Sequence, residues 1–598
     1  MMNQADGMKI EFVRGTEAKQ LLDDVAFGAE WSALWHQCPW VTPFQLPGYA
    51  CTWYAVYRET FEPLLILSRD ERGRLQGLLT LAVAISSGRV VVAGDFQAEY
   101  QTWICPPELA ETFPPLALRE LWRHLPAAIL RLNYLPPCTP TAWLEGPEAK
   151  QHFLLKSHRR PLIRFGDGRE IAESLAKRSN KNRLRQIEKL GDIEHRHVTD
   201  PAEMEAVIDA IIPFHDARHL AVRGLEPFVT DPLRRTFALR LMKVPGLLHV
   251  TTFKAGEHLI TAALCGIGKK EVQLGLIAHN PWLSRYSPGK FQIFFLSRML
   301  MEQGFEQLDL TPGGDPYKER FANTWDEVHT LTLFPNWVGR AKGVAFQGIE
   351  GTVRGALRVL RVSPDQARLF ALKIKAFRPI RFAGRLIRRA SSWIGSQCET
   401  RIYSYPAASV ARLDAVGSIR RDALADLLLY EPERGGPSRR DFIASAMQRI
   451  EDNQHAYTRA ESGRLRQYAW LAERPSEELA SQTLPGYTLP PDSALIAVLH
   501  TIPQRRSREF GALSLAAMLR DAARVPKTRS IFIPILADDA ASRRLIAETG
   551  FVYEGSLFQQ TRFGRCRQWT IISESRKFPA SPPPADTTRP KELAGSAS

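Results

Sequence analysis

The stretches GLLHVTTFKAGEHLITAALCGIGKKEVQLGLIAHN (residues 246–280), SRYSPGKFQIFFLSRML (284–300) and LDLTPGGDPYKERFAN (308–323) decide the fold. The first contains three apolar runs joined by short polar turns, which predicts three strands of one sheet. A glycine-containing loop, an apolar helical pattern and a further strand at Glu306–Thr311 follow. A meander that runs into a strand–loop–helix–strand unit predicts an α/β layer with helices packed on a mixed sheet.

A similar arrangement occurs three times along the 598 residues, so we expect three α/β units. The first copy comprises LLILSRDERGRLQGLLTLAVA (64–84), RVVVAGDF (89–96) and a helix around Leu116–Leu125. The third comprises RQYAWLAERPSEELASQ (466–482), DSALIAVLHTIP (492–503), LSLAAMLRDAA (513–523) and the strand Ser530–Leu536. The predicted parts are units at 1–160, 161–336 and 401–575, a basic connector at 337–400 and a disordered tail at 576–598.

Two of the loops that precede the predicted helices carry the residue types of an anion site. These residues are Ser287, Gly289 and Lys290 in the second unit, and Arg506, Arg508 and Gly511 in the third. Backbone N–H groups and the positive end of a helix dipole bind phosphate at such a place, and glycine permits close approach. The alternative is a basic surface turn. Neither loop has Walker or dinucleotide-binding glycine spacing, which argues against an NTPase or a Rossmann dehydrogenase.

The corresponding loop of the first unit differs. It reads Cys105-Pro106-Pro107-Glu108, without glycine and with an acidic residue. We therefore expect the first unit to bind no anion at this place.

The third unit resembles the GNAT acyl-CoA transferases. Directly after the predicted strand Ser530–Leu536 the chain runs from Asp539 through Ser542 to Gly550-Phe551, which is similar to the family's N-x-x-[AS]…G-F element with Asp539 in the asparagine place. The resemblance implies that Asp539 belongs to the CoA-binding region. Leu513 and Ile546 depart from the family's small loop residue and from the tyrosine that often protonates the leaving thiolate.

Residues 10–336 resemble the CelD-like acetyltransferases, tandem GNAT proteins related to FemAB. The resemblance rests on SPG before the helix and on the D-x-T-x-G-x-x-x-Y-K element at 309–318. It implies an α/β fold of GNAT-type mixed-sheet units, with the first two as a tandem whose N-terminal half is degenerate. It also implies acetyl-CoA as co-substrate and an acceptor linked to exopolysaccharide or cellulose synthesis.

Candidate catalytic residues lie at the end of the strand Glu306–Thr311 and in the segment after it. Acyl transfer from a thioester needs an anchored CoA, a deprotonated acceptor and a stabilised oxyanion. Asp309 is the preferred base, with a turn-capping carboxylate as the alternative, and Tyr317 and Lys318 begin the next helix. Lys318 would hold a phosphate or carboxylate of the acceptor, or is a solvated helix lysine. The family resemblance implies a splayed strand that polarises the carbonyl, and no covalent intermediate.

The formal charge of +15 is concentrated in one segment. Residues 340–389 hold 13 Lys and Arg against Glu350 and Asp365, so 13 − 2 = +11 of the total lies there. The amphipathic arginine-rich helix expected within 368–394 is first interpreted as an interdomain linker whose apolar stripe packs on a neighbouring domain; peripheral contact with an anionic membrane is the alternative. Nucleic acid is disfavoured, because no nucleic-acid module is recognisable.

Composition narrows the classes of protein that remain possible. No apolar run reaches the ~18–20 residues of a spanning helix, and the N-terminus has no signal-peptide core, so we expect a cytoplasmic protein, at most peripheral to the inner membrane face. The seven cysteines are scattered without zinc spacing, and no metal site is predicted.

The leading hypothesis is an acetyl-CoA-dependent N- or O-acyltransferase that acts on a sugar, an exopolysaccharide precursor or a related small metabolite. Two alternatives stay open. One is a FemAB-like aminoacyl transferase that uses charged tRNA. The other is a non-catalytic scaffold in envelope or exopolysaccharide synthesis.

Overall fold

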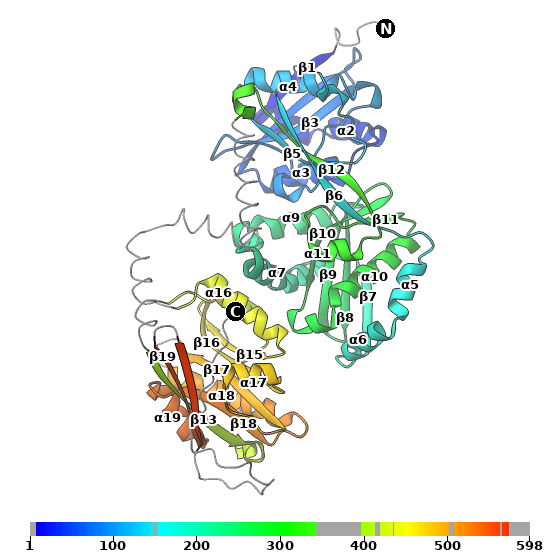
Figure 1. The fold of residues 1–598 in the computed structure, drawn as a ribbon. Helices are drawn as coiled ribbons and strands as arrows, with labels where there is room; N and C mark the ends of the chain where they lie inside the picture. Colours follow the sequence, from blue (N-terminus) through cyan, green and yellow to red (C-terminus); the bar gives the residue numbers. More distant parts are fainter. Residues whose placement is uncertain are drawn as a thin grey trace. The chain divides into compact units, whose positions relative to one another are not determined.

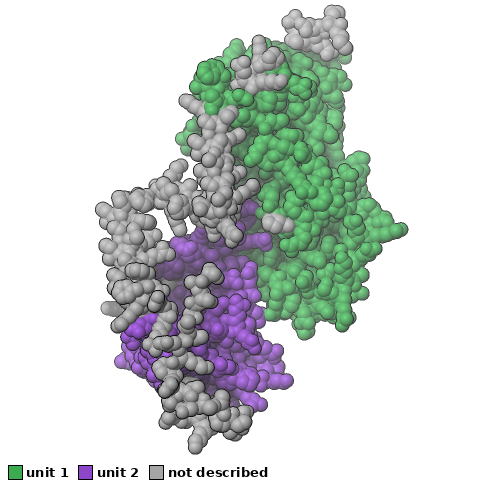
Figure 2. Space-filling model, in the orientation of Figure 1, with its two compact units in different colours: residues 1–215, 227–364 green, residues 216–226, 365–598 purple. Residues whose placement is uncertain are grey.

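The computed structural model describes residues 8–146, 152–341, 396–412, 419–433, 436–501, 507–562 and 565–572. The chain divides into two compact units, residues 1–215 with 227–364 and residues 216–226 with 365–598 (Figure 2). Arg506, the amphipathic segment 368–394 and the tail 576–598 lie outside the described residues.

Unit 1 contains two sheets (Figure 1). The smaller sheet has four antiparallel strands in the order β1-β2-β3-β4. Its strands are β1 (Lys9–Arg14), β2 (Phe61–Arg69), β3 (Leu75–Ala84) and β4 (Val90–Val92). β2 and β3 are buried along most of their length, because they are apolar on both faces and lie between helices and the neighbouring strands.

The larger sheet of unit 1 has eight strands in the order β5-β12-β6-β11-β10-β9-β8-β7. They are β5 (Leu130–Leu135), β6 (Phe153–Arg164), β7 (Ile193–Val198), β8 (Leu248–Ala255), β9 (His258–Ile267), β10 (Glu271–His279), β11 (Gln307–Asp309) and β12 (Thr324–Leu333). Only β10 and β11 run parallel among the described strands of this sheet.

Unit 2 has one eight-stranded sheet in the order β14-β15-β16-β17-β18-β13-β19-β20. The strands are β13 (Ser396–Pro406), β14 (Arg420–Arg421), β15 (His455–Glu461), β16 (Arg464–Ala472), β17 (Ser493–Thr501), β18 (Ser530–Leu536), β19 (Val552–Arg562) and β20 (Arg565–Ile572). Its parallel pair is β17 with β18.

The helices connect these strands. They are α1 (Thr16–Asp23), α2 (Val25–Gln37), α3 (Pro47–Val56), α4 (Phe113–His124), α5 (Arg169–Ala176), α6 (Arg178–Glu188), α7 (Pro201–Arg223), α8 (Pro227–Thr230), α9 (Leu233–Met242), α10 (Pro288–Glu302), α11 (Pro316–Phe321), α15 (Leu424–Leu427), α16 (Arg439–Glu451), α17 (Glu477–Thr483), α18 (Ser507–Arg524) and α19 (Ala540–Thr549). The 3-10 turns are η1 (Pro43–Gln45), η2 (Asp95–Gln97), η3 (Pro107–Leu109), η4 (Ala142–Leu144), η6 (Pro281–Tyr286) and η7 (Ala407–Arg412).

The two eight-stranded sheets share one plan. In each sheet, one strand of the parallel pair has an antiparallel neighbour on its other side, β6 beside β11 and β13 beside β18. In the sequence, this neighbour comes before the other strands of its domain. The α/β class and the repeated strand–helix–strand order predicted from sequence are confirmed. The boundaries predicted at residues 160 and 400 fall inside β6 and β13, because both strands pair with the sheet of the domain that follows them.

Alternating side chains place helices on both faces of the larger sheet of unit 1. On β9, Ala263 and Cys265 belong to the apolar cluster that includes Ile293 and Leu296 of α10. Ala262 and Leu264 point to the opposite face and join Ile208 and Ile211 of α7. This period of two is the strand geometry that the sequence pattern predicts.

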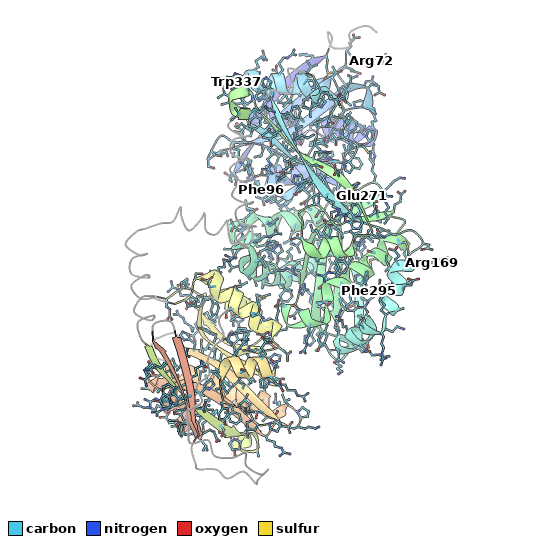
Figure 3. All side chains as sticks on the ribbon, viewed as in Figure 1. Arg72, Phe96, Arg169, Glu271, Phe295 and Trp337 are labelled. Atoms are coloured by element: carbon cyan, nitrogen blue, oxygen red, sulfur yellow. The ribbon has the colours of Figure 1, made fainter. Side chains whose placement is uncertain are left out.

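A group of one buried and two partly buried histidines, His249, His195 and His197, lies on β7 and β8. The His195 ring lies 5.3 Å from that of Phe295 of α10 (labelled in Figure 3), and the His197 and His249 rings stack at 4.1 Å. Burial lowers the pKa of His195 to about 4, helped by the charge of Arg298. Its Nε2 has no hydrogen-bond partner among the described residues. The fold therefore holds His195 neutral.

We expect acidification to destabilise unit 1 through His195. Because the folded pKa lies below the unfolded value, the unfolded state binds the proton first, and stability falls as pH drops from about 6.5 toward 4. Between about pH 7.5 and pH 5 this residue costs about 2 kcal/mol. His195→Phe should remove that part of the pH dependence in urea titrations. An equal loss of stability in the variant and the wild type would contradict the assignment.

Candidate active site

The parallel pair of the larger sheet in unit 1 opens after three residues. Glu271–Gln273 of β10 pair with Gln307–Asp309 of β11, after which β11 ends and β10 continues to His279. A register shift between Leu274 and Leu276 shows a bulge on β10 immediately beyond the pairing. The backbone of β10 therefore loses its partner on one side, and its polar groups can turn toward a ligand.

Two residues with left-handed backbone flank this opening. Ser287 has φ 56° and ψ 52° directly before α10, and Thr311 has φ 62° two residues after β11. A positive φ is costly for a β-branched side chain such as Thr311, so the surrounding contacts must impose it. Strain of this kind clusters at functional sites.

Cations gather at the N-terminus of α10. Lys290 Nζ donates to Asn180 Oδ1 at 3.0 Å, and Asn180 is fully buried. Burial lowers the pKa of Lys290, and the charges of Arg183, Lys177 and Arg320 lower it further. Four cations thus lie within electrostatic reach of one another at the positive end of a helix dipole, which is a site for a polyanion.

Gly289 lies in the first turn of α10. A Cβ there would meet only His279 Nδ1, at 3.8 Å, so packing does not require glycine at this position. Ser287, Gly289 and Lys290, which the sequence analysis proposes for an anion, lie at the N-cap and in the first turn of α10.

Asp309 is the last residue of β11 and is completely buried. Its Oδ2 accepts hydrogen bonds from Tyr100 Oη at 2.5 Å and Arg160 Nη1 at 3.2 Å, and its Oδ1 accepts from the Thr311 N–H at 2.7 Å. Burial raises the pKa of Asp309 to about 7, against the opposing charge of Arg160. An enclosed carboxylate with three donors positions the end of β11 and cannot reach an acceptor directly.

Lys318 has a similar positioning geometry. Its Nζ donates to Thr311 Oγ1 at 2.9 Å and to the Thr311 carbonyl at 3.2 Å, and it lies 3.9 Å from Asp315 Oδ2. These contacts hold the strained loop that follows β11. Tyr317 packs against the apolar cluster beneath α10. The sequence predicted Tyr317 and Lys318 at the start of a helix, and both lie in α11, with contacts to the loop after β11 and to the apolar cluster.

The N-terminal part of unit 1 adds groups that sequence reasoning missed. Glu99 precedes Tyr100, which binds Asp309, and it is partly buried with a pKa raised by burial. Lys318 and Arg234 of α9 act on it electrostatically. No motif surrounds Glu99 or Arg234, so only the fold could identify them.

Unit 2 repeats the opening of the parallel pair. Ser493–Leu495 of β17 pair with Ser530–Phe532 of β18, and a register shift between Ile496 and Val498 follows on β17. Asp539 caps α19, accepting from the Ser542 N–H at 3.0 Å. Ile546 is fully buried.

The predicted anion loop of the third unit is described only from Ser507 onward. α18 begins at Ser507, so Arg508 and Gly511 belong to its first turns and not to a loop. The helix starts early because Arg508, Glu509 and Ala512 are good helix formers. Arg506 lies outside the described residues, so the anion site predicted from Arg506, Arg508 and Gly511 stays a prediction.

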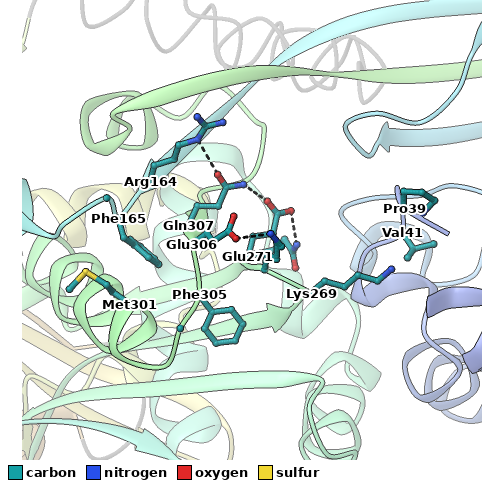
Figure 4. Close-up of a pocket in the computed structure, with 15 residues that line it drawn as sticks. Pro39, Val41, Arg164, Phe165, Lys269, Glu271, Met301, Phe305, Glu306 and Gln307 are labelled. Carbon is teal, nitrogen blue, oxygen red and sulfur yellow. Dashed lines mark hydrogen bonds and ion pairs between the residues drawn. The ribbon is translucent and has the colours of Figure 1, made fainter. Parts of the chain in front are cut away.

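A cavity of about 1110 Å³ lies at the other end of the parallel pair, where β10 and β11 begin (Figure 4). Several of its polar groups are paired with one another. Lys270 Nζ donates to Glu306 at 2.8 Å, and Gln307 Nε2 donates to Glu271 at 2.5 Å. The cavity lies away from both Ser287 and Thr311, so we do not assign the acyl-transfer site to it.

The described residues contain neither a metal-binding cluster nor a membrane-spanning helix. Within the described ranges, no cluster of three or more His, Cys, Asp or Glu side chains is arranged to hold a metal ion. Nor does any helix in that part of the chain have the length and apolar character to cross a membrane.

Comparison with known proteins agrees with this geometry. Residues 175–319 match a family model described as an acetyltransferase (GNAT) domain. That range contains β10, α10, β11 and the start of α11, and so the whole opened parallel pair. No curated protein matches the sequence.

Solved structures similar to this chain include three of particular interest. The C-terminal domain of a putative lysylphosphatidylglycerol synthetase from Agrobacterium fabrum is 14% identical, with 55% of this chain and 95% of that chain covered and a TM-score of 0.34. FemX is 10% identical, with coverages of 50% and 95% and a TM-score of 0.35. A tandem GNAT protein from the clavulanic acid biosynthesis pathway is 12% identical, with coverages of 64% and 100% and a TM-score of 0.20.

At these identities and TM-scores the three structures carry no argument about activity or substrate. The family match and the opened parallel pair bear on the chemistry instead. Residues 175–319 form a GNAT domain, and the protein is an acyltransferase.

Proposed function

We propose that the protein transfers an acyl group from acetyl-CoA to an amine or hydroxyl of a sugar, an exopolysaccharide precursor or a related small metabolite, and that unit 1 performs the reaction. The observation that carries this proposal is the opened β10–β11 pair with a cationic helix N-terminus beside it. A pyrophosphate fits the N-terminus of α10, because the positive end of the helix dipole and the Lys290 side chain lie there.

Each of the site residues would have a separate role. Ser287, Gly289 and Lys290 would hold the pyrophosphate of acetyl-CoA. The unpaired edge of β10 beyond Gln273 would accept the thioester in the opening and direct backbone N–H groups at its carbonyl oxygen. Asp309 and Lys318 would fix the loop that carries Thr311, and act as positioning residues.

Calorimetric titration of acetyl-CoA into the full chain tests the proposal. We expect saturable binding at sub-millimolar concentration, weakened by salt because the contacts are ionic. Coenzyme A should compete, whereas a thioester without the nucleotide should compete poorly. Absence of binding at millimolar acetyl-CoA would refute the proposal. A stoichiometry of two would indicate that unit 2, which repeats the opened pair, also binds.

A further inference from the structure

The cavity at the start of β10 and β11 has the dimensions of a second binding site in unit 1 (Figure 4). Its volume of about 1110 Å³ matches the largest of the ~300–1,000 Å³ pockets that hold small organic ligands. The opened end of the parallel pair lies at the other end of these strands. Neither the thioester nor the pyrophosphate proposed above would therefore fill this cavity.

A chain of hydrogen bonds runs along one wall of the cavity. Arg164 Nε donates to Gln307 Oε1 at 3.4 Å, and Gln307 Nε2 donates to Glu271 Oε2 at 2.5 Å. Gln273 Nε2 donates to Glu271 Oε1 at 3.0 Å. All four residues line the cavity, and Figure 4 draws these bonds as dashed lines. The chain joins a guanidinium at its outer end to an amide at its inner end.

The inner end of this chain lacks a donor. Gln273 is 1% exposed, and its Oε1 has no hydrogen-bond partner among the described residues. Glu271 fixes the orientation of the amide, because an ionised carboxylate only accepts and must face the NH₂ group. Gln273 Oε1 lies beside Gly268, a lining residue whose Cβ, if present, would be 3.7 Å from it. A buried acceptor without a donor is costly, which indicates a partner that the described chain does not supply.

The outer end of the chain has a cation without an anion. Of the other two cations that line the cavity, Lys270 pairs with Glu306 at 2.8 Å, and the Lys269 ammonium donates to three backbone carbonyls of residues 35–38 at 3.0–3.3 Å. Arg164 is exposed and forms no ion pair within 4.0 Å among the described residues. The two Nη groups of Arg164 are thus available to a carboxylate or a phosphate.

Apolar side chains form another part of the lining. Phe165, Met301 and Phe305 all face the cavity and belong to one apolar cluster (Figure 4). Surface of this kind binds the carbon body of a ligand, because the contact removes apolar area from water. The cavity therefore offers a cation, an apolar surface and a hydrogen-bond acceptor.

We propose that this cavity binds an organic anion that has a carboxylate or phosphate at one end, an apolar body, and an O–H or N–H donor at the other end. Arg164 binds the anionic group, Phe165 and Phe305 contact the body, and Gln273 Oε1 accepts from the donor. The site is separate from the opened end of the β10–β11 pair. It goes beyond the proposed acyl transfer and does not depend on it.

Calorimetric titration of the full chain with matched probes tests the proposal. The probes are 4-hydroxyphenyl alkanoates of increasing chain length, the same acids without the hydroxyl, and the primary amides of the hydroxylated acids. A series of 4-hydroxyphenylalkyl phosphates shows which anion is preferred. We expect a hydroxylated anion of suitable length to bind about tenfold more tightly than its dehydroxy acid and its amide, because each of these lacks one polar contact.

Two variants assign the contacts. Arg164→Gln should weaken binding of the anionic probes about tenfold and leave the amides unchanged, whereas Arg169→Gln, at an exposed arginine paired with Asp167, should retain full affinity. Gln273→Met, which keeps the shape of the side chain, should abolish the preference for the hydroxylated probe. If Gln273→Met does not fold, the comparison of hydroxylated and dehydroxy acids in the wild type tests the same contact.

The outcomes separate this site from the acyl-transfer site. Saturating coenzyme A should leave the affinity of the probes unchanged, and competition between them would overturn the second site. So would a lack of saturable binding by every hydroxylated anion at millimolar concentration, or equal affinity of Arg164→Gln and wild type for the anions. Protein that binds the probes but not acetyl-CoA contradicts only the proposed acyl transfer.

Discussion

Replacing Lys290 by alanine is expected to weaken acetyl-CoA binding 10- to 100-fold. The estimate of roughly 1.5–3 kcal/mol is that of a hydrogen bond to a charged group. Lys290 lies in the first turn of α10, and the charges of Arg183, Lys177 and Arg320 already lower its pKa. Four like charges destabilise one another, so a pyrophosphate that neutralises them gains more than it would at a single lysine.

The control for this variant lies at the other end of β10. Lys270 is exposed and paired with Glu306, and Lys270→Ala should leave acetyl-CoA affinity unchanged. A short acetyl thioester without phosphates should be used equally well by wild type and Lys290→Ala, because it never reaches α10. Calorimetry gives the affinities. Equal acetyl-CoA affinity in Lys290→Ala and wild type would place the pyrophosphate elsewhere.

Much of the local structure around this site was predictable. The strands β8, β9 and β10, the loop at Ser287 and the helix α10 follow from short-range apolar periodicity and turn residues, which act within a few residues of one another. The same holds for β17, α18 and β18. Only the start of α18 was misplaced, because helix formers outweighed the loop residues there.

The strand that lies next to the parallel pair in each eight-stranded sheet, β6 or β13, could not be predicted from the sequence. β6 reads FLLKSHRRPLIR, and its charges and proline break the alternation that marks a strand. Its place between β11 and β12 depends on pairing with residues about 150 positions away, at a distance that no local pattern reports.

The same limit applies to Asp309. Asp309 was correctly placed at a strand end. Its full burial and its hydrogen bond to Tyr100 depend on residues far away in the sequence. These contacts change its expected role from base to positioning residue.

Arg160 is expected to be the residue of unit 1 most sensitive to substitution. It is 3% exposed and contacts three carboxylates. Nε and Nη2 bind Asp326, both at 2.7 Å, while Nη1 reaches Glu271 at 3.1 Å and Asp309 at 3.2 Å. Arg160→Met would leave the Asp309 carboxylate buried without its cation, and removing one partner of a buried ion pair typically costs about 3–5 kcal/mol.

Urea denaturation of the full chain at about pH 7.5 and pH 5 measures this effect, and Arg159→Met is the matched control. Arg159 is the preceding residue in the same strand but is exposed and stacks on Trp325 at 4.3 Å, so its loss should cost less than about 1 kcal/mol.

The comparison of the two pH values tests whether the buried charge of Asp309 causes the loss of stability. Without Arg160 the pKa of Asp309, already raised by burial, rises further, so protonation at pH 5 should restore part of the stability that Arg160→Met loses at pH 7.5. Asp309→Asn in the Arg160→Met background should restore a similar part at both pH values. If Arg160→Met costs no more than Arg159→Met, the buried network does not hold the end of β11, and the positioning role of Asp309 falls with it.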